Sequence, residues 1–224
     1  CAAVSTDYWI TWSPIARRFT PAPMSPAAVC SGIWGKCWRA AAPWSKGGIA
    51  HGDVLLLSRP LGTGVLFASA MAGACQPEAL DTVLQHMSRS QHRLLDQLEP
   101  HRQAIHACTD VTGFGLLGHL GEMLASSSPL RITLWTNRIP AYPEAMDRLA
   151  QGYASSLAPA NRRSWQWLDG LIQLDDSPSQ ALLELLVDPQ TCGPLLLACP
   201  ETTAQTLTAE GPWIPIGNAT ADHG

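Results

Sequence analysis

The stretch CTDVTGFGLLGHL, residues Cys108 to Leu120, is the most informative part of this 224-residue sequence. It places three glycines in G-x-G-x-x-G spacing after a lone carboxylate, Asp110. The apolar residues before it indicate the end of a strand, and the leucines after it recur at helical spacing. We therefore predict a strand, a tight glycine turn and a helix. Glycine allows positive φ, and a helix start offers free N–H groups, so the turn could hold phosphate with Asp110 binding a divalent cation.

The glycine turn is open to other interpretations. A dinucleotide site with the same glycine spacing also needs an acidic residue at the end of the next strand. The next expected strand, residues 131–135, runs into Thr136-Asn137-Arg138, which contains no acid. The sequence therefore does not favour a nicotinamide or flavin site. A glycine turn used only for packing stays possible, as does a role for Asp110 in capping the turn.

Composition limits the class of protein. Apolar residues make up 46% of the chain and charged residues 14%, which is typical of a folded protein with a large core. No run of 18 apolar residues predicts a transmembrane helix, and no signal-peptide pattern precedes the body. The chain starts at Cys1 and its first methionine is Met24, which indicates a fragment of a longer reading frame.

Charge and cysteine content exclude further classes. Residues 1–46 carry five basic residues against one acid, whereas residues 47–224 carry nine arginines, no lysine and seventeen acids. An acidic body argues against a nucleic-acid-binding face. Seven cysteines without a C-x-x-C pair favour neither a disulfide framework nor a zinc site. We expect reduced thiols in a cytoplasmic protein.

The chain divides near Gly47. Residues 1–46 contain five of the nine tryptophans without helical or strand periodicity, so we expect an unassigned leader that is disordered or not native to the domain. Residues 47–224 are expected to form one α+β domain with a mixed β-sheet packed against helices. The strands are predicted at residues 53–57, 131–135, 195–199 and 213–217, the last as an edge strand tolerating proline. The helices are predicted at residues 65–71, 78–98, 116–124, 143–150, 182–186 and 202–208, with residues 151–164 as a loop.

Four other residues are candidates for chemistry. Asp188 precedes a proline and is interpreted as capping its own turn through the backbone. Cys192 lies in a turn, but no neighbouring residue would lower its pKa, which favours a structural thiol. His86 and His92 are six residues apart on an expected helix and cannot share one face, so we interpret both as surface residues. Asp110 is the better candidate for a metal ligand.

Three segments in this order resemble the C-terminal half of selenophosphate synthetase, also called selenide, water dikinase. They are GDVLLLSRPLGTGVL (52–66), ACTDVTGFGLLGHLGEM (107–123) and LLVDPQTCGPLLLACP (185–200). The resemblance covers about residues 49–220 and places the chain in the aminoimidazole ribonucleotide synthetase superfamily. It is most specific in TDVTGFGLLGHL. Short motifs at Ile139-Pro140, Asn161-Arg162 and Ile216-Gly217 also resemble the family.

The resemblance implies a function. The family converts ATP, selenide and water into selenophosphate, AMP and phosphate, as dimers that bind ATP and several Mg²⁺ ions mainly through an N-terminal domain. The aspartate of the TDVTGFG run, here Asp110, would be the metal ligand supplied by the C-terminal domain. Cations are needed because charge spreads over the phosphoryl oxygens. We infer that Thr109, Thr112 and residues 113–115 support it.

Some residues depart from the family pattern. The N-terminal catalytic cysteine or selenocysteine, its lysine and the other metal-binding aspartates have no counterpart here, so isolated activity is not expected. Arg59 replaces the usual lysine, and Cys192-Gly193-Pro194 replaces Ser-Gly-Gly. The alternatives are another ATP-using member, such as thiamine monophosphate kinase or a hydrogenase maturation factor, and a non-catalytic dimerisation or partner-binding module.

Overall fold

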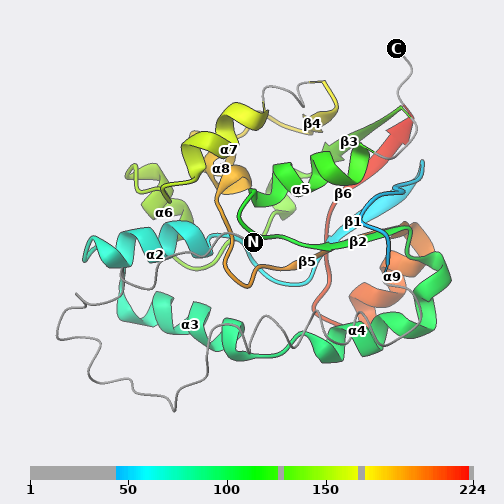
Figure 1. Ribbon diagram of the computed structural model, residues 1–224, viewed down its shortest axis with the longest axis horizontal. Coiled ribbons are helices and arrows are strands. Elements are labelled where there is room, and N and C mark those ends of the chain that lie inside the picture. The colour runs from blue at the N-terminus through cyan, green and yellow to red at the C-terminus, as the bar shows by residue number, and fades with distance from the viewer. Residues whose placement is uncertain (1–43, 126–128, 166–169, 222–224) are drawn as a thin grey trace, which may run out of the picture. The chain divides into compact units, whose positions relative to one another are not determined.

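A six-stranded mixed β-sheet forms the centre of the domain (Figure 1). The computed structural model describes residues 44–125, 129–165 and 170–221, so most of the predicted leader lies outside the described residues. The strand order is β2-β5-β1-β6-β3-β4. The predicted mixed sheet packed with helices is confirmed. Its strands are β1 (Asp53–Leu57), β2 (Ala107–Asp110), β3 (Leu130–Leu134), β4 (Ile172–Leu174), β5 (Leu195–Pro200) and β6 (Ile214–Ala221).

The middle of the sheet is buried on both faces. Strand β1 pairs antiparallel with β5 and β6, and Leu55, Leu56 and Leu57 are 0% exposed. An apolar run without alternation is what a doubly covered strand requires. Strand β2 pairs antiparallel with β5 at one edge, and β3 pairs parallel with β4 at the other.

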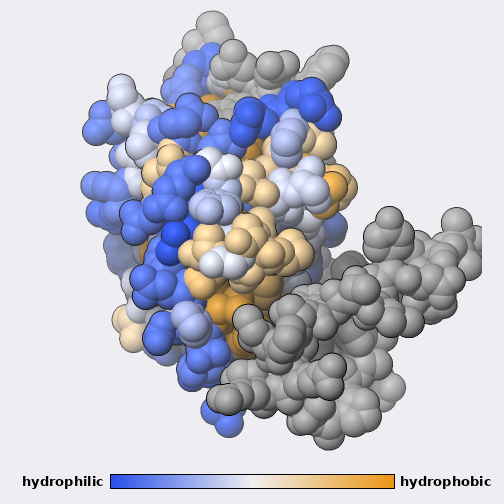
Figure 2. Space-filling model, turned by 90° about the vertical axis from the view of Figure 1, so that its left-hand side faces the viewer, coloured by the Kyte–Doolittle hydropathy of each residue, from blue (hydrophilic) through white to orange (hydrophobic). Residues whose placement is uncertain are grey.

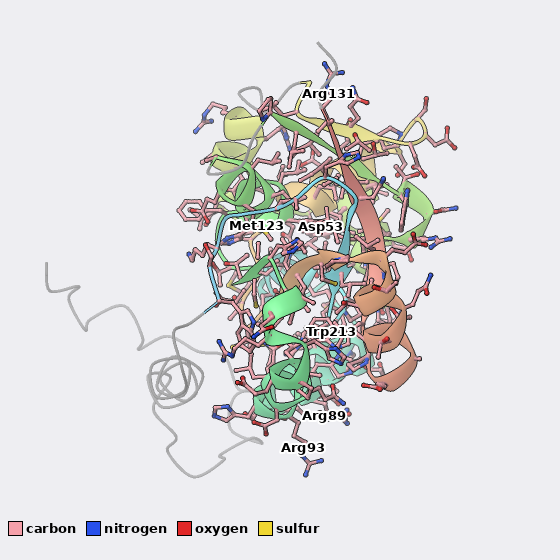
Figure 3. The ribbon with its side chains drawn as sticks, turned by 90° about the vertical axis from the view of Figure 1, so that its right-hand side faces the viewer. Asp53, Arg89, Arg93, Met123, Arg131 and Trp213 are labelled. Atoms are coloured by element: carbon pink, nitrogen blue, oxygen red, sulfur yellow. The ribbon has the colours of Figure 1, made fainter. Side chains whose placement is uncertain are left out.

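Helices cover both sides of this sheet. Helices α5, α6, α7 and α8 pack against one another and α2 packs on α6, whereas α9 packs against β1, β5 and β6. Met123, on α5, and helix α9 lie on opposite sides of the sheet in Figure 3. No helix in the described part of the chain is long and apolar enough to cross a membrane. The helices are α2 (Thr63–Met71), α3 (Pro77–Ser88), α4 (His92–Leu98), α5 (Gly115–Leu124), α6 (Ala145–Ala150), α7 (Ala158–Trp165), α8 (Gln180–Val187) and α9 (Glu201–Glu210).

The single helix predicted over residues 78–98 is wrong, because the chain breaks it into α3 and α4. Arg89 ends α3 with an extended backbone, at φ −81° and ψ 120°. Gln91 then turns inward: its side chain accepts a hydrogen bond from Ser58 Oγ at 3.1 Å and donates to Gly193 O at 3.1 Å. Arg89 and Arg93, two residues before and after Gln91 in the sequence, point outward (Figure 3). A buried polar contact from distant residues thus overrides helical periodicity.

Two further predictions need correction. Strand β6 is not at an edge but lies between β1 and β3. Its Pro215 is tolerated because it pairs opposite Leu56, next to a register shift between Leu55 and Leu56. The predicted loop over residues 151–164 contains most of helix α7, and strand β4 was not predicted.

Gly115 controls how closely the central turn approaches helix α8. It has φ +70°, and a Cβ at this position would meet the backbone carbonyl carbon of Val187 at 2.8 Å. Gly113, two residues earlier, has no left-handed φ, and a Cβ added there would have no atom within 4 Å. The two glycines of one motif therefore differ in their physical role.

We expect Gly115→Ala to destabilise the protein by about 2–4 kcal/mol, because it combines a left-handed backbone with a clash against Val187. The matched control Gly113→Ala should change the free energy of unfolding by less than about 1 kcal/mol. Urea unfolding followed by circular dichroism measures both. Equal effects of the two substitutions would contradict a close-approach role for Gly115.

Candidate functional site

Asp110 is the last residue of β2, where it pairs with Leu195 of β5. Its side chain is half-buried and accepts no hydrogen bond from the residues that the structure describes. Its charge and that of Lys46 both act on the nearby imidazole of His119. A carboxylate with unused lone pairs, outside the apolar core, is chemically suited to an oxygen-preferring cation.

The turn after Asp110 is held by a buried histidine. The backbone N–H of Thr112 donates to His119 Nε2 at 3.0 Å, and Thr112 Oγ1 lies 3.2 Å from the same nitrogen. His119 Nδ1 lies 3.1 Å from Glu122 Oε2. Burial lowers the pKa of His119, although the charges of Glu122 and Asp110 oppose this. The imidazole is therefore neutral near pH 7, which leaves Nε2 free to accept.

Two side chains in the segment after α8 cap the start of helix α2. Gln190 Oε1 accepts from Gly62 N at 3.0 Å and Thr63 N at 3.2 Å. Asp188 Oδ2 accepts from Gly64 N at 3.1 Å and Val65 N at 3.2 Å. These are consecutive backbone donors at a helix start, which otherwise have no partner. Asp188 therefore caps a distant helix, and the interpretation that it caps its own turn is wrong.

Asp188 is also electrostatically unusual. It is 0% exposed, and its Oδ1 is buried without a partner among the described residues. Burial raises the pKa of Asp188 to about 7, although the donors Val65 N, Gln190 Nε2 and Gly64 N oppose this. The unpartnered Oδ1 is where a proton would reside in the neutral form.

Asn161 joins two of these segments. Its Nδ2 donates to Gly113 O at 2.8 Å and to Val187 O at 2.9 Å. Thr112 O in turn accepts from Gln190 N at 3.0 Å. The glycine turn, the start of α2 and the segment after α8 therefore meet at one place. Sequence reasoning noted Asn161 only as a short family-like motif, because no local pattern reveals a contact across 48 residues.

The remaining candidates have structural contacts. Arg59 Nη1 donates to His86 O at 3.0 Å and Cys192 O at 3.2 Å, and burial lowers the pKa of Arg59. Cys192 is half-buried with φ 49°. His86 is half-buried, with Nδ1 3.2 Å from Tyr142 Oη, so its interpretation as a plain surface residue is wrong. His92 begins α4 and is also half-buried.

Asp110 does not belong to a ready-made cluster of metal ligands within the described residues. In the ranges that the structure describes, no three His, Cys, Asp or Glu side chains gather into a group that could hold a metal ion by themselves. This fits Mg²⁺, which proteins often hold through one or two carboxylates together with substrate phosphates and water.

Asp188 should make stability depend on pH. Because its pKa is higher in the folded state than the ordinary 3.8, the folded protein binds the proton more tightly. Its contribution is fully present below about pH 4 and is lost as pH rises to about 7, by up to about 4 kcal/mol. Asp188→Asn should remove this fall, and the exposed control Asp81→Asn should keep it. Urea unfolding between pH 4.5 and 8 checks this; parallel profiles for Asp188→Asn and the parent protein would contradict it.

Sequence comparisons relate this chain to known proteins. Residues 50–224 match the family model described as AIR synthase related protein, C-terminal domain. The selenide, water dikinase of Desulfitobacterium hafniense is 36% identical over 162 residues, which are 72% of this chain and 45% of that protein. That of Pelobacter propionicus is 33% identical over 168 residues, 74% of this chain and 46% of that protein. The chain thus spans less than half the length of these relatives.

Solved structures share the fold. Thiamine-monophosphate kinase from Stenotrophomonas maltophilia superposes with a TM-score of 0.55 and 18% identity, over 83% of this chain and 52% of that one. The hydrogenase maturation protein HypE of E. coli gives 0.51 and 19% identity, over 82% and 50%. Identities this low establish a common fold alone. The family match over residues 50–224 shows that the chain belongs to the family of AIR synthase related proteins, as their C-terminal domain, and the relatives above show that it is similar in sequence to selenide, water dikinases.

Proposed function

We propose that this chain is the C-terminal portion of an ATP-dependent selenophosphate synthetase. The reaction converts ATP, selenide and water into selenophosphate, AMP and phosphate. The identity of 33–36% to proteins named selenide, water dikinase supports this assignment over a thiamine monophosphate kinase or a hydrogenase maturation factor. As part of an enzyme of this class, the chain would act as a phosphotransferase and use ATP as a substrate.

The single observation that carries the proposal is the half-buried carboxylate of Asp110 at the end of an edge strand. Asp110 would hold one Mg²⁺, and the ion would neutralise charge that develops on the phosphoryl oxygens. This chain's own task is to keep the carboxylate in place. Thr112 does so through its contacts with His119 and Gln190, and Gly115 by allowing close packing.

A partner domain is part of the proposal. Phe114 is 61% exposed and Leu157 is 53% exposed. Phe114 directly follows Gly113, and Leu157 lies four residues before Asn161, whose side chain donates to Gly113 O. Large apolar side chains beside a polar site favour a covering partner. We propose that an N-terminal ATP-binding domain covers them and supplies the remaining metal ligands, in a homodimeric enzyme.

A second candidate is a non-catalytic dimerisation or partner-binding module. It is favoured by exposed apolar side chains far from Asp110 in sequence: Met71 at the end of α2 is 77% exposed and Leu84 on α3 is 46% exposed. Figure 2 shows apolar residues gathered on the side of the domain where these helices lie. Such a module would need no metal at Asp110, which separates the two candidates.

Titration calorimetry with Mg–ATP tests the metal role. We expect Asp110→Asn to weaken Mg–ATP binding about ten-fold or more, because it removes a charged ligand and changes little volume. Asp81→Asn, on the exposed side of α3, is the matched control and should bind like the parent chain. Identical heats for parent, Asp110→Asn and Asp81→Asn would favour the non-catalytic module.

We also expect no turnover by the 224-residue chain alone, since one carboxylate cannot assemble the site for several cations. AMP formation from ATP and selenide, followed by chromatography, measures this. Steady AMP production by the purified chain, abolished by Asp110→Asn, would show that the chain is catalytically sufficient.

A further inference from the structure

His119 is buried, yet both of its ring nitrogens have polar partners. It is 3% exposed, and it lies on α5 nine residues after Asp110. A backbone N–H can only donate, so Thr112 N at 3.0 Å identifies Nε2 as an acceptor without a proton. The proton of the neutral ring is then on Nδ1, facing Glu122 Oε2 at 3.1 Å. The contacts assign one tautomer.

The contacts that this tautomer makes help to fix the backbone directly after Asp110. Thr112 uses all its polar groups: N–H and Oγ1 face His119, and its carbonyl accepts from Gly115 N at 3.0 Å and Gln190 N at 3.0 Å. Val111, between Asp110 and Thr112, is 0% exposed and its N–H donates to Pro194 O at 2.9 Å. The backbone is thus fixed at both of the residues that follow Asp110.

We propose that His119, oriented by Glu122, is a positioning residue that aims the Asp110 carboxylate at its cation. The inference rests on the proposed function, since it concerns the same carboxylate. His119 itself binds no metal, because Nε2 is engaged with Thr112 and Nδ1 with Glu122. Removing an outer partner that bonds a metal ligand directly typically costs about 10–100-fold in metal affinity. His119 acts through the backbone of Thr112, so we expect a loss at the lower end of that range.

The first test is spectroscopic and needs no ligand. Imidazole ¹⁵N–¹H correlation spectra of the 224-residue chain at pH 7 should show His119 neutral, with its proton on Nδ1. Glu122→Ala should weaken this preference, whereas Glu122→Gln keeps an acceptor and should retain it. Glu122 is 45% exposed, so neither change opens a cavity. A ring with its proton on Nε2, or a doubly protonated ring, would overturn the proposal.

The second test is a double-mutant cycle with Mg–ATP calorimetry. We expect His119→Leu to weaken binding about ten-fold, His119→Gln to retain most of it, and His119→Leu to add little in the Asp110→Asn background. Urea unfolding of each variant confirms that it is folded. Independent, additive losses would mean that His119 does not act through Asp110. Loss with Asp110→Asn but not with His119→Leu overturns the positioning role alone. No loss with either overturns this role and the proposed function together.

Discussion

The arrangement of the site depends on how the backbone N–H groups at the start of helix α2 find hydrogen-bond acceptors. The first turn of α2 offers four consecutive backbone donors, Gly62 to Val65, and the side chains of Gln190 and Asp188 accept from all of them. Leaving such groups buried and unpaired would cost about 1–3 kcal/mol each. The segment after α8 must therefore lie against α2. From that position Gln190 N reaches Thr112 O and ties in the glycine turn.

The polar side chains near the place where the glycine turn, the start of α2 and the segment after α8 meet have different roles. Asp188 lies deep inside, where burial favours its neutral form and its acceptors serve the backbone. His119 is kept neutral by burial and serves as an acceptor for Thr112. Asp110 is half-buried, and its carboxylate oxygens accept no hydrogen bond from the described residues. The fully buried carboxylate of Asp188 thus holds the fold, while the half-buried one of Asp110 remains available for a ligand. This division is expected from the cost of removing a charge from water.

Local sequence predicted several elements well. The strand, glycine turn and helix around Asp110 are present, because their apolar spacing and glycines act within a few residues. The apolar runs at 53–57 and 195–199 are strands for the same reason. Two of the errors follow from long-range contacts. Gln91 ends a helix through Ser58 and Gly193, and β6 becomes central because both its neighbours come from elsewhere in the chain.

The sequence by itself determined the class of fold, the family and the candidate ligand Asp110, since these depend on periodicity and on residue types at fixed spacing. Only the tertiary structure decided what Asp188, Gln190, Asn161 and His119 do. His119 reaches Thr112 across 7 residues, Asn161 reaches Val187 across 26, and Asp188 and Gln190 reach the start of α2 across 124 and 128. The bonds of Asn161, Asp188 and Gln190 form only after the sheet has brought those segments together. A side chain's type limits which bonds it can make, but the buried surroundings choose among them.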